Sequence, residues 1–313
     1  MTSLKARRLI AAFAVLVTVC LPASAGAAPG GISLSPFEKS LSLNPGDSSQ
    51  SFNLSLTNHT SSLQELTLSV RDFGTLNNTG GIILEGSNPY TQKYGLSAWL
   101  SLEKDVVDLN PGETSQVLIT VNNQSSLTPG GHYGAIIASV NSLNQAADNN
   151  VVLKQQLVSL VLVNKRGGEH YNLKLTSVSH SGGWFSLPKN VRLTFQNPGN
   201  VQVVPRGVVK LVSPAGTVIA QGIINTGSAF VLPETFRQLD VPLTKIRSSL
   251  PWPGLYHLEV DYRYDGITNF AVNTYRLRFI NLGLYLVLAV ILSILWLCRR
   301  PILRWFKTHA NPR

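Results

Sequence analysis

Ser51-Phe52-Asn53-Leu54-Ser55-Leu56 (SFNLSL, residues 51–56) alternates polar and apolar residues at every position. Successive side chains of a β-strand point to opposite faces, so this period of two predicts a strand between a core and water. The alternation recurs at 39–43 (KSLSL) and 65–70 (ELTLSV), with turn signals such as Asn44-Pro45-Gly46 between the runs. This pattern is typical of an antiparallel β-sandwich.

A repeated spacing indicates that there are two sandwiches. Leu109-Asn110-Pro111-Gly112 leads to Gly131-His132-Tyr133, and Leu232-Pro233-Glu234 leads to Gly254-Leu255-Tyr256, with 24 residues from leucine to tyrosine in both copies. Gly-x-Tyr at the start of a late strand resembles the tyrosine corner of immunoglobulin-like sandwiches, in which the phenol bonds to the backbone upstream. We therefore predict an all-β protein with two tandem immunoglobulin-like antiparallel β-sandwiches, over 30–165 and 170–278, joined by a hinge at 164–169.

The N-terminal end has the features of a secretory signal. Lys5, Arg7 and Arg8 precede an apolar run at 9–21, and small residues that suit a cleavage site follow Pro22. We predict a signal peptide over 1–27. A lipoprotein signal that ends at Cys20 is the alternative interpretation.

A second uncharged run lies near the C-terminus. Residues 279–298 (FINLGLYLVLAVILSILWLC) contain no charge, and Arg299 and Arg300 follow directly. At ~1.5 Å per residue, a helix of this length spans the ~30 Å apolar core of a bilayer. Basic residues mark the cytoplasmic side. We predict a transmembrane helix over 279–298, a basic cytoplasmic tail over 299–313, and a single-pass plasma-membrane protein with its N-terminal region extracellular.

Charge and cysteine content limit the function further. The chain has 26 basic and 16 acidic residues, but the basic excess lies mainly in the two ends, and 18 basic and 16 acidic residues lie between them. The high pI is therefore no sign of nucleic-acid binding, and we predict no nucleic-acid partner. Cys20 and Cys298 both belong to the apolar runs, so the sandwiches are expected to fold without disulfides.

The residues form no recognisable catalytic or metal-binding motif. Six histidines are scattered singly, without the spacing of metal ligands. Glu103, Asp105, Asp108 and Glu113 could hold Ca²⁺, but they lack the close D-x-D-x-D-G spacing, and exposed strand edges and turns explain them better. We predict no enzyme activity, no catalytic residues, no metal and no cofactor.

Exposed aromatic rings are the remaining candidates for a binding site, because ring faces cover sugars through apolar contact. Tyr90 and Tyr94 belong to a predicted loop at 86–96, and Trp184 follows a Gly182-Gly183 turn. We take these three residues as candidate ligand-binding residues, with packing of the loop as the alternative role. Trp99 lies in a strand-like run and is expected in the core.

Two stretches of the first region carry a family resemblance. They are 31–58 and 94–139, and within the second the similar motifs are Trp99-Leu100, Leu109–Glu113, and Pro129-Gly130-Gly131 followed by Gly134-Ala135-Ile136. They resemble the peptidoglycan-binding domain of WxL-interacting proteins from Gram-positive bacteria. The resemblance implies a cell-wall location, peptidoglycan or another wall polymer as ligand, and a secreted protein with the W-x-L signature as a further partner.

Together these observations predict a non-enzymatic, membrane-anchored cell-surface protein. Its outer sandwich would bind peptidoglycan or wall-associated proteins. The alternative is a structural spacer or assembly module that binds only protein partners through a sheet edge.

Overall fold

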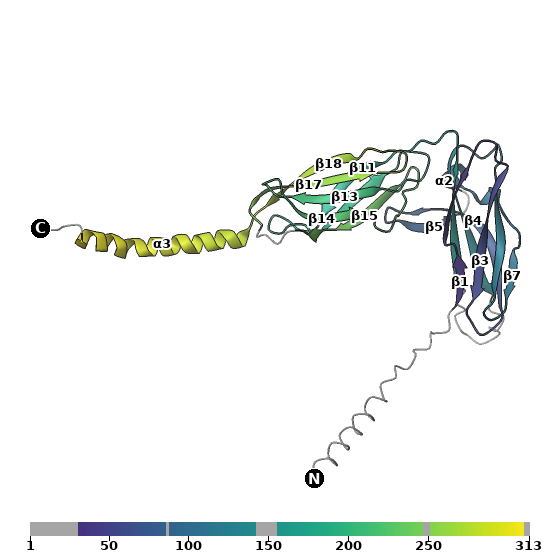
Figure 1. Ribbon diagram of the computed structural model, residues 1–313, viewed down its shortest axis with the longest axis horizontal. Helices are drawn as coiled ribbons and strands as arrows, with labels where there is room; N and C mark the ends of the chain where they lie inside the picture. The colour runs from purple at the N-terminus through teal and green to yellow at the C-terminus, as the bar shows by residue number, and fades with distance from the viewer. Residues whose placement is uncertain (1–30, 86–87, 142–154, 247–250, 310–313) are drawn as a thin grey trace, which may run out of the picture.

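The computed structural model describes residues 31–85, 88–141, 155–246 and 251–309, and the side chains of 298–309 are not included. The predicted signal peptide at 1–27 lies outside the described residues. The fold is all-β, with two immunoglobulin-like sandwiches that follow each other along the chain. Figure 1 shows that the strands of the first sandwich run across the direction of those of the second.

The first sandwich contains a four-stranded sheet in the order β1-β3-β8-β6 and a six-stranded sheet in the order β2-β10-β9-β4-β5, in which β7 also pairs with β4. Its strands are β1 (Ile32–Ser35), β2 (Glu38–Leu43), β3 (Ser49–Asn58), β4 (Gln64–Leu76), β5 (Gly81–Glu85), β6 (Leu100–Leu102), β7 (Val106–Leu109), β8 (Thr114–Asn122), β9 (Gly130–Asn141) and β10 (Gln156–Lys165). Two short helical segments, α2 (Pro89–Tyr94) and the 3-10 turn η1 (Ser97–Trp99), lie between β5 and β6.

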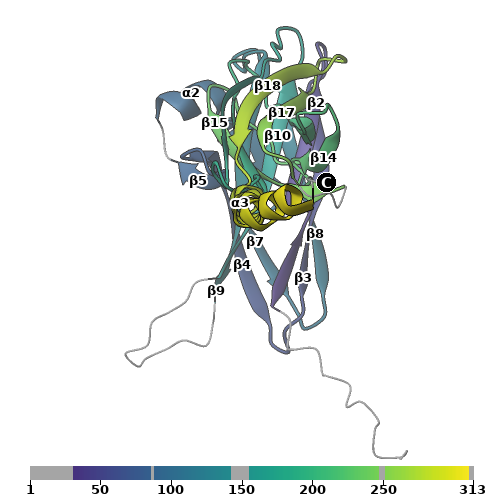
Figure 2. The ribbon, with the colours of Figure 1, turned by 90° about the vertical axis from the view of Figure 1, so that its left-hand side faces the viewer.

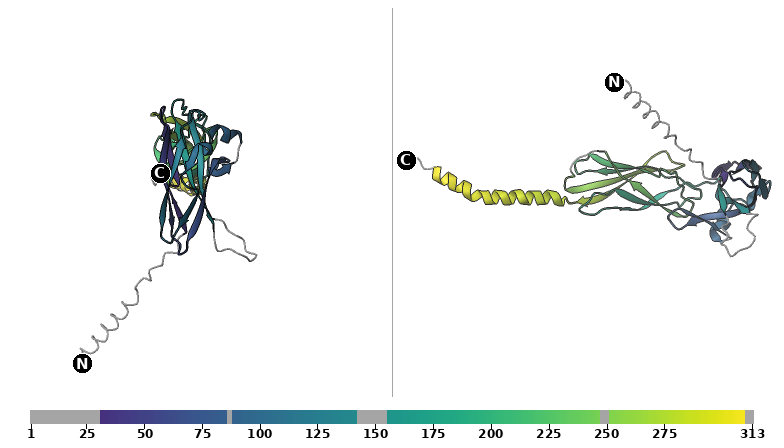
Figure 3. Two further views of the ribbon diagram at one scale, coloured as in Figure 1. Left: turned by 90° about the vertical axis from the view of Figure 1, so that its right-hand side faces the viewer. Right: turned by 90° about the horizontal axis from the view of Figure 1, so that it is seen from below.

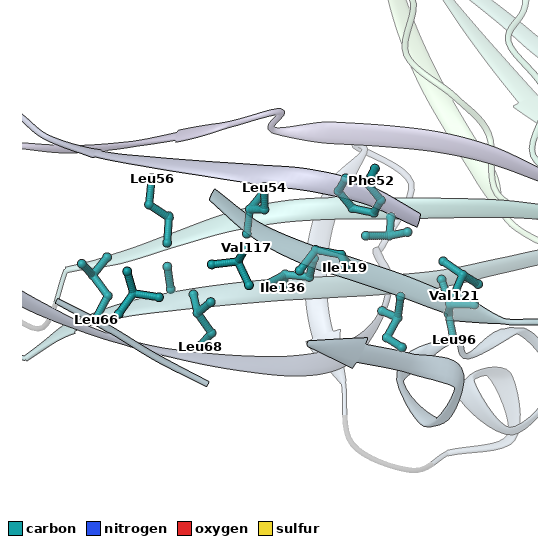
Figure 4. Packing of buried hydrophobic residues seen from close by; sticks show 14 of the residues in the cluster. Phe52, Leu54, Leu56, Leu66, Leu68, Leu96, Val117, Ile119, Val121 and Ile136 are labelled. Carbon is teal, nitrogen blue, oxygen red and sulfur yellow. The ribbon is translucent and has the colours of Figure 1, made fainter. Parts of the chain in front are cut away.

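The core of the first sandwich is built by the predicted alternation. Phe52, Leu54 and Leu56 of β3 are buried, and the polar residues between them face outward. They meet alternate apolar residues of β8 and β4, as Figure 4 shows for Val117, Ile119, Leu66 and Leu68. Each fully buried leucine or isoleucine contributes roughly 1.5–3 kcal/mol relative to an exposed one, so this interior favours the sandwich over other arrangements.

The second sandwich has a three-stranded sheet in the order β11-β12-β15 and a five-stranded sheet in the order β16-β14-β13-β17-β18. Its strands are β11 (Lys174–His180), β12 (Asn190–Gln196), β13 (Arg206–Val212), β14 (Val218–Ile224), β15 (Phe236–Pro242), β16 (Thr244–Lys245), β17 (Gly254–Arg263) and β18 (Ala271–Phe279). The core lies between the sheets, where the ring of Phe195 meets that of Tyr262 edge-on at 5.1 Å.

One pair of strands departs from the antiparallel prediction. β2 runs parallel to β10, with Leu160 opposite Glu38 and Lys165 opposite Leu43. The chain moves from the first sheet to the second at Pro36, between β1 and β2, and proline has no N–H to continue a ladder. The second strand of this sandwich and its last strand are therefore neighbours.

The predicted membrane segment is corrected in two respects, namely where its helix begins and whether that helix could cross a bilayer. Phe279 is not part of a helix: it is the last residue of β18, buried and opposite Gly254. The helix α3 (Leu282–His309) begins after it and projects from the end of the second sandwich (Figures 1 and 3), with its apolar side chains exposed as far as Leu297. Among the described residues, no helix combines the length and the apolar character needed to cross a bilayer. The predicted transmembrane helix at 279–298, and with it the single-pass plasma-membrane location and the assignment of 299–313 as a cytoplasmic tail, are corrected accordingly.

Candidate functional site

The two sandwiches meet in an aromatic and aliphatic cluster, which we call the junction. It consists of Phe73, Tyr94, Tyr133, Ala135, Leu160 and Leu162 from the first sandwich and Phe230 and Leu232 from the second. All eight are buried, so the contact resembles a small core rather than a loose surface contact. The junction therefore holds the two sandwiches together through packed side chains.

Tyr133 of β9 lies at the centre of the junction. Its ring is fully buried and lies 5.8 Å from that of Phe73. Its hydroxyl donates a hydrogen bond of 2.9 Å to Oε1 of Gln202 in the second sandwich. Burial raises the pKa of the Tyr133 phenol well above its usual value of 10, so the phenol remains a donor at any physiological pH.

The hinge is closed by Asn200, which bonds to both sides of it. The Gly131 N–H donates to the Asn200 carbonyl at 2.7 Å, and the Asn200 side chain bonds the Gly168 carbonyl at 2.8 Å and the His170 N–H at 2.6 Å. Gly130 has a φ of +125°, and a Cβ there would lie 2.9 Å from the Asn200 carbonyl oxygen. Glycine at 130 thus permits the close approach of the two backbones.

An ion pair closes one side of the junction. Lys93 of α2 pairs with Glu234, which also accepts a 3.0 Å hydrogen bond from the Tyr94 hydroxyl. The hydrogen bond from Lys93 lowers the pKa of Glu234, and that from Tyr94 acts in the same direction. Both charged side chains are about half exposed, at 56% and 51%, so the pair is screened by solvent and contributes little energy.

The hairpin of β4 and β5 forms an apolar arm beside the junction, defined by residues 74–84. Three consecutive residues of β5 are exposed, namely Ile82 (41%), Ile83 (37%) and Leu84 (38%), and Leu76 of β4 is 50% exposed. Figure 1 shows β5 on the side of the first sandwich that faces the second, and Figure 2 shows it close to β15. The tip of the arm is held there because the Gln238 N–H of β15 donates to the Asn78 carbonyl at 2.7 Å.

β5 is also the last strand of its sheet, paired on one side with β4. Such an edge presents main-chain N–H and C=O groups that another strand can bond. The arm therefore combines a bonding edge with exposed apolar side chains and a fixed position.

Of the three predicted ligand-binding residues, Tyr94 belongs to the junction and Tyr90 packs against it. Tyr90 and Tyr94 stack with their ring centroids 5.0 Å apart, but Tyr94 is only 3% exposed, and Tyr90 packs partly buried against the same cluster. The predicted loop around them is the helix α2, capped at Asn88 by a bond from the Thr91 N–H. Their placement corresponds to the packing role. Trp99 packs partly buried against the core of the first sandwich.

Trp184, 64% exposed, lies at the far end of the second sandwich, where its carbonyl accepts a hydrogen bond from the Ile280 N–H. The structure therefore does not bring it near Tyr90 and Tyr94. An open pocket of about 750 Å³ lies close by, between the loop after β11, the β13–β14 turn and the segment before β17. No motif in the sequence indicated this pocket, because its walls come from segments that lie far apart along the chain.

The titratable groups do not gather into a metal site within the described residues. Glu113, part of the acidic run, accepts hydrogen bonds of 2.8 Å from the backbone and side chain of Asn110 and so closes a turn. His132 is buried with Nε2 2.7 Å from the Thr128 carbonyl, and burial lowers its pKa below the usual 6.5. These side chains have structural partners.

A search of protein-family models and a search of curated proteins both found no match. Solved structures do match in fold. The class 5 fimbriae chaperone CfaA matches with a TM-score of 0.43 and 9% identity, covering 78% of this chain and 98% of that one. The CsuC–CsuE chaperone–tip adhesion subunit pre-assembly complex of Acinetobacter baumannii matches with a TM-score of 0.39 and 9% identity, covering 80% and 100%. The Salmonella enterica SafA pilin–SafB chaperone complex matches with a TM-score of 0.37 and 12% identity, covering 79% and 96%. Likenesses this distant carry no argument about what this chain binds.

These findings correct the family resemblance inferred from 31–58 and 94–139. The similar solved structures are of fimbrial chaperones and not of WxL-interacting proteins, and no family model supports the latter. Proline-glycine turns and alternating strands recur in many sandwiches, so the shared motifs reflect the architecture rather than the family. The functions implied by that resemblance are corrected with it: the Gram-positive cell-wall role, peptidoglycan or wall-polymer binding and the W-x-L partner.

Proposed function

We propose that the protein is a non-enzymatic binding protein that takes up an extended segment of a partner polypeptide along β5, in the angle between its two sandwiches. The observation that carries the proposal is the run Ile82–Leu84, which is exposed on a strand with one free edge. Apolar residues on an open edge are normally covered, since they invite pairing with another strand.

The chemistry of the edge favours a polypeptide over other ligands. Strand addition supplies main-chain hydrogen bonds along the edge, and side chains on both faces of the arm supply apolar contacts. A nucleic acid would need cations on the arm, and residues 74–84 contain neither lysine nor arginine. The bond from Gln238 to Asn78 holds the arm in place, which lowers the entropy lost on binding.

The test uses reduced, carboxymethylated α-lactalbumin as a permanently unfolded polypeptide and the full-length protein. On mixing, hydrogen exchange is expected to slow at those amides of 81–85 that do not bond to β4. The double variant Ile82→Lys, Leu84→Lys is expected to bind more than about tenfold more weakly, because each buried aliphatic side chain contributes roughly 1.5–3 kcal/mol.

Leu118→Lys is the matched control, because Leu118 is equally exposed (42%) but lies on β8, away from the arm. Protection elsewhere than in β5, or equal binding by the double variant, would overturn the proposal. Protection of β5 in the protein alone that grows with its own concentration would also overturn it, since the partner would then be a second copy of the chain.

A further inference from the structure

The pocket at the far end of the second sandwich is lined mainly by apolar side chains, and its charged residues are all basic. Its wall is mainly apolar and includes Leu187, Leu211, Ile219, Leu243 and Trp252. Its volume of about 750 Å³ lies in the range of ~300–1,000 Å³ usual for small-molecule sites. Trp252 is 69% exposed, so a large aromatic surface faces solvent at this place.

The polar groups of the wall divide into those already used and those free for a ligand. The Tyr256 hydroxyl donates to the Trp252 carbonyl at 2.8 Å, and the Ser213 and Ser186 hydroxyls accept from the Thr217 and Gly183 N–H groups. These groups hold the loops in shape. The charge that a ligand should carry is therefore set by the charged side chains of the wall.

Both charged residues of the wall are cations. Lys189 and Lys245 line the pocket, both are exposed, and no aspartate or glutamate lines it. Neither lysine has an ion-pair partner among the described residues, in contrast to Lys210, which pairs with Asp261. An anion placed here would meet two unpaired ammonium groups above an apolar floor.

We infer that this pocket binds a small amphiphilic acid, with its apolar body against Trp252 and its carboxylate between Lys189 and Lys245. A wholly polar anion would bind less well, because its polar groups would lose their hydrating water without gaining hydrogen bonds from the apolar wall. The two lysines exclude an amphiphilic cation for the opposite reason. This site is separate from β5 and does not depend on the role proposed for the arm.

The experiment titrates the full-length protein with octanoate, octan-1-ol and octylammonium, three eight-carbon probes that differ in charge. Binding is followed by NMR on the indole N–H signal of Trp252, assigned with Trp252→Phe. Octanoate is expected to shift this signal saturably and to bind best of the three. Lys189→Met with Lys245→Met is expected to weaken octanoate roughly tenfold and to leave octan-1-ol unchanged.

Lys174→Met is the matched control, since Lys174 is exposed at the opposite end of β11 from the pocket. Octanoate bound only by the exposed apolar surface of α3 would leave the Trp252 signal in place, which would overturn the inference. Equal binding of octylammonium and octanoate to the unaltered protein would do the same, and this comparison holds even if the double variant folds poorly.

Discussion

The hydroxyl of Tyr133 donates a hydrogen bond to Oε1 of Gln202 at 2.9 Å, which links β9 of the first sandwich to the loop between β12 and β13 of the second. Tyr256 occupies the corresponding place in the second sandwich, and its hydroxyl bonds the Trp252 carbonyl four residues upstream. The same Gly-x-Tyr signal thus builds a corner within one sandwich and a contact between two sandwiches in the other.

Tyr133→Phe is expected to lower the free energy of unfolding by about 1–3 kcal/mol, because it leaves the Gln202 oxygen without its donor. Urea denaturation measures the loss, and trypsin cleavage after Lys165 or Arg166 in the hinge should become faster. Tyr256→Phe is the comparison: it should lower stability but leave hinge cleavage unchanged. Unaltered hinge cleavage in Tyr133→Phe would show that the bond does not hold the junction.

Gly131→Ala is expected to destabilise the protein by roughly 1–3 kcal/mol, because an added Cβ would lie 2.1 Å from the Tyr133 hydroxyl oxygen. The phenol would have to move and would lose Gln202. Gly227→Ala is the control, since a Cβ at 227 has no atom within 4 Å and φ there is not positive. Thermal unfolding followed by circular dichroism measures both. Equal transition temperatures for the two variants would contradict the predicted crowding.

Glu234→Gln is expected to weaken the junction only slightly, by about 0.2–1 kcal/mol, because the pair with Lys93 is half exposed. The pKa of Glu234 is lowered in the folded protein, so its contribution is present above the usual 4.5 and is lost as the pH falls through the folded value. Hinge cleavage measured in low and high salt checks this. Asp240→Asn breaks the similarly exposed Arg192–Asp240 pair away from the junction, and it should leave hinge cleavage unchanged. A salt-independent effect of Glu234→Gln would argue against an ionic origin.

Acidification from pH 7.5 to 5.5 is expected to lower stability through His132. The ring is buried, so its pKa is lower in the folded protein than the 6.5 of the unfolded chain, and the nearby Lys165 charge acts in the same direction. The unfolded state therefore binds a proton first, and stability falls as the pH drops below 6.5. Urea denaturation at several pH values should show a smaller slope for His132→Asn than for the exposed His180→Asn. If the free energy of unfolding of the two variants fell equally with pH, His132 would not be the source of the pH dependence.

Local patterns in the sequence predicted β2, β3 and part of β4, because alternation of period two depends only on which residues face the core. Asn190–Gln196 of the second sandwich follows it nearly residue by residue. The helix α2 was missed although Asn88 followed by Pro89 is a recognised start signal, with asparagine as the cap and proline in the first turn. Six residues are too few to show a helical period.

Features that depend on long-range contact could not be predicted from one stretch. The parallel pairing of β2 with β10 joins segments whose own sequences suit either orientation. The burial of Tyr94 depends on Tyr133 and on Glu234, which lies 140 residues further along the chain. The exposure of Ile82–Leu84 could likewise not be predicted, because apolar residues in a strand ordinarily face a core.

The pairing of β2 with β10 also governs when the first sandwich can form. The Ser159 hydroxyl donates to the Pro36 carbonyl across 123 residues of chain, so a ribosome must release nearly the whole sandwich before β2 can pair with β10. Until then β2 stays unpaired in the growing polypeptide, and the nascent protein depends on its surroundings to keep it from mispairing.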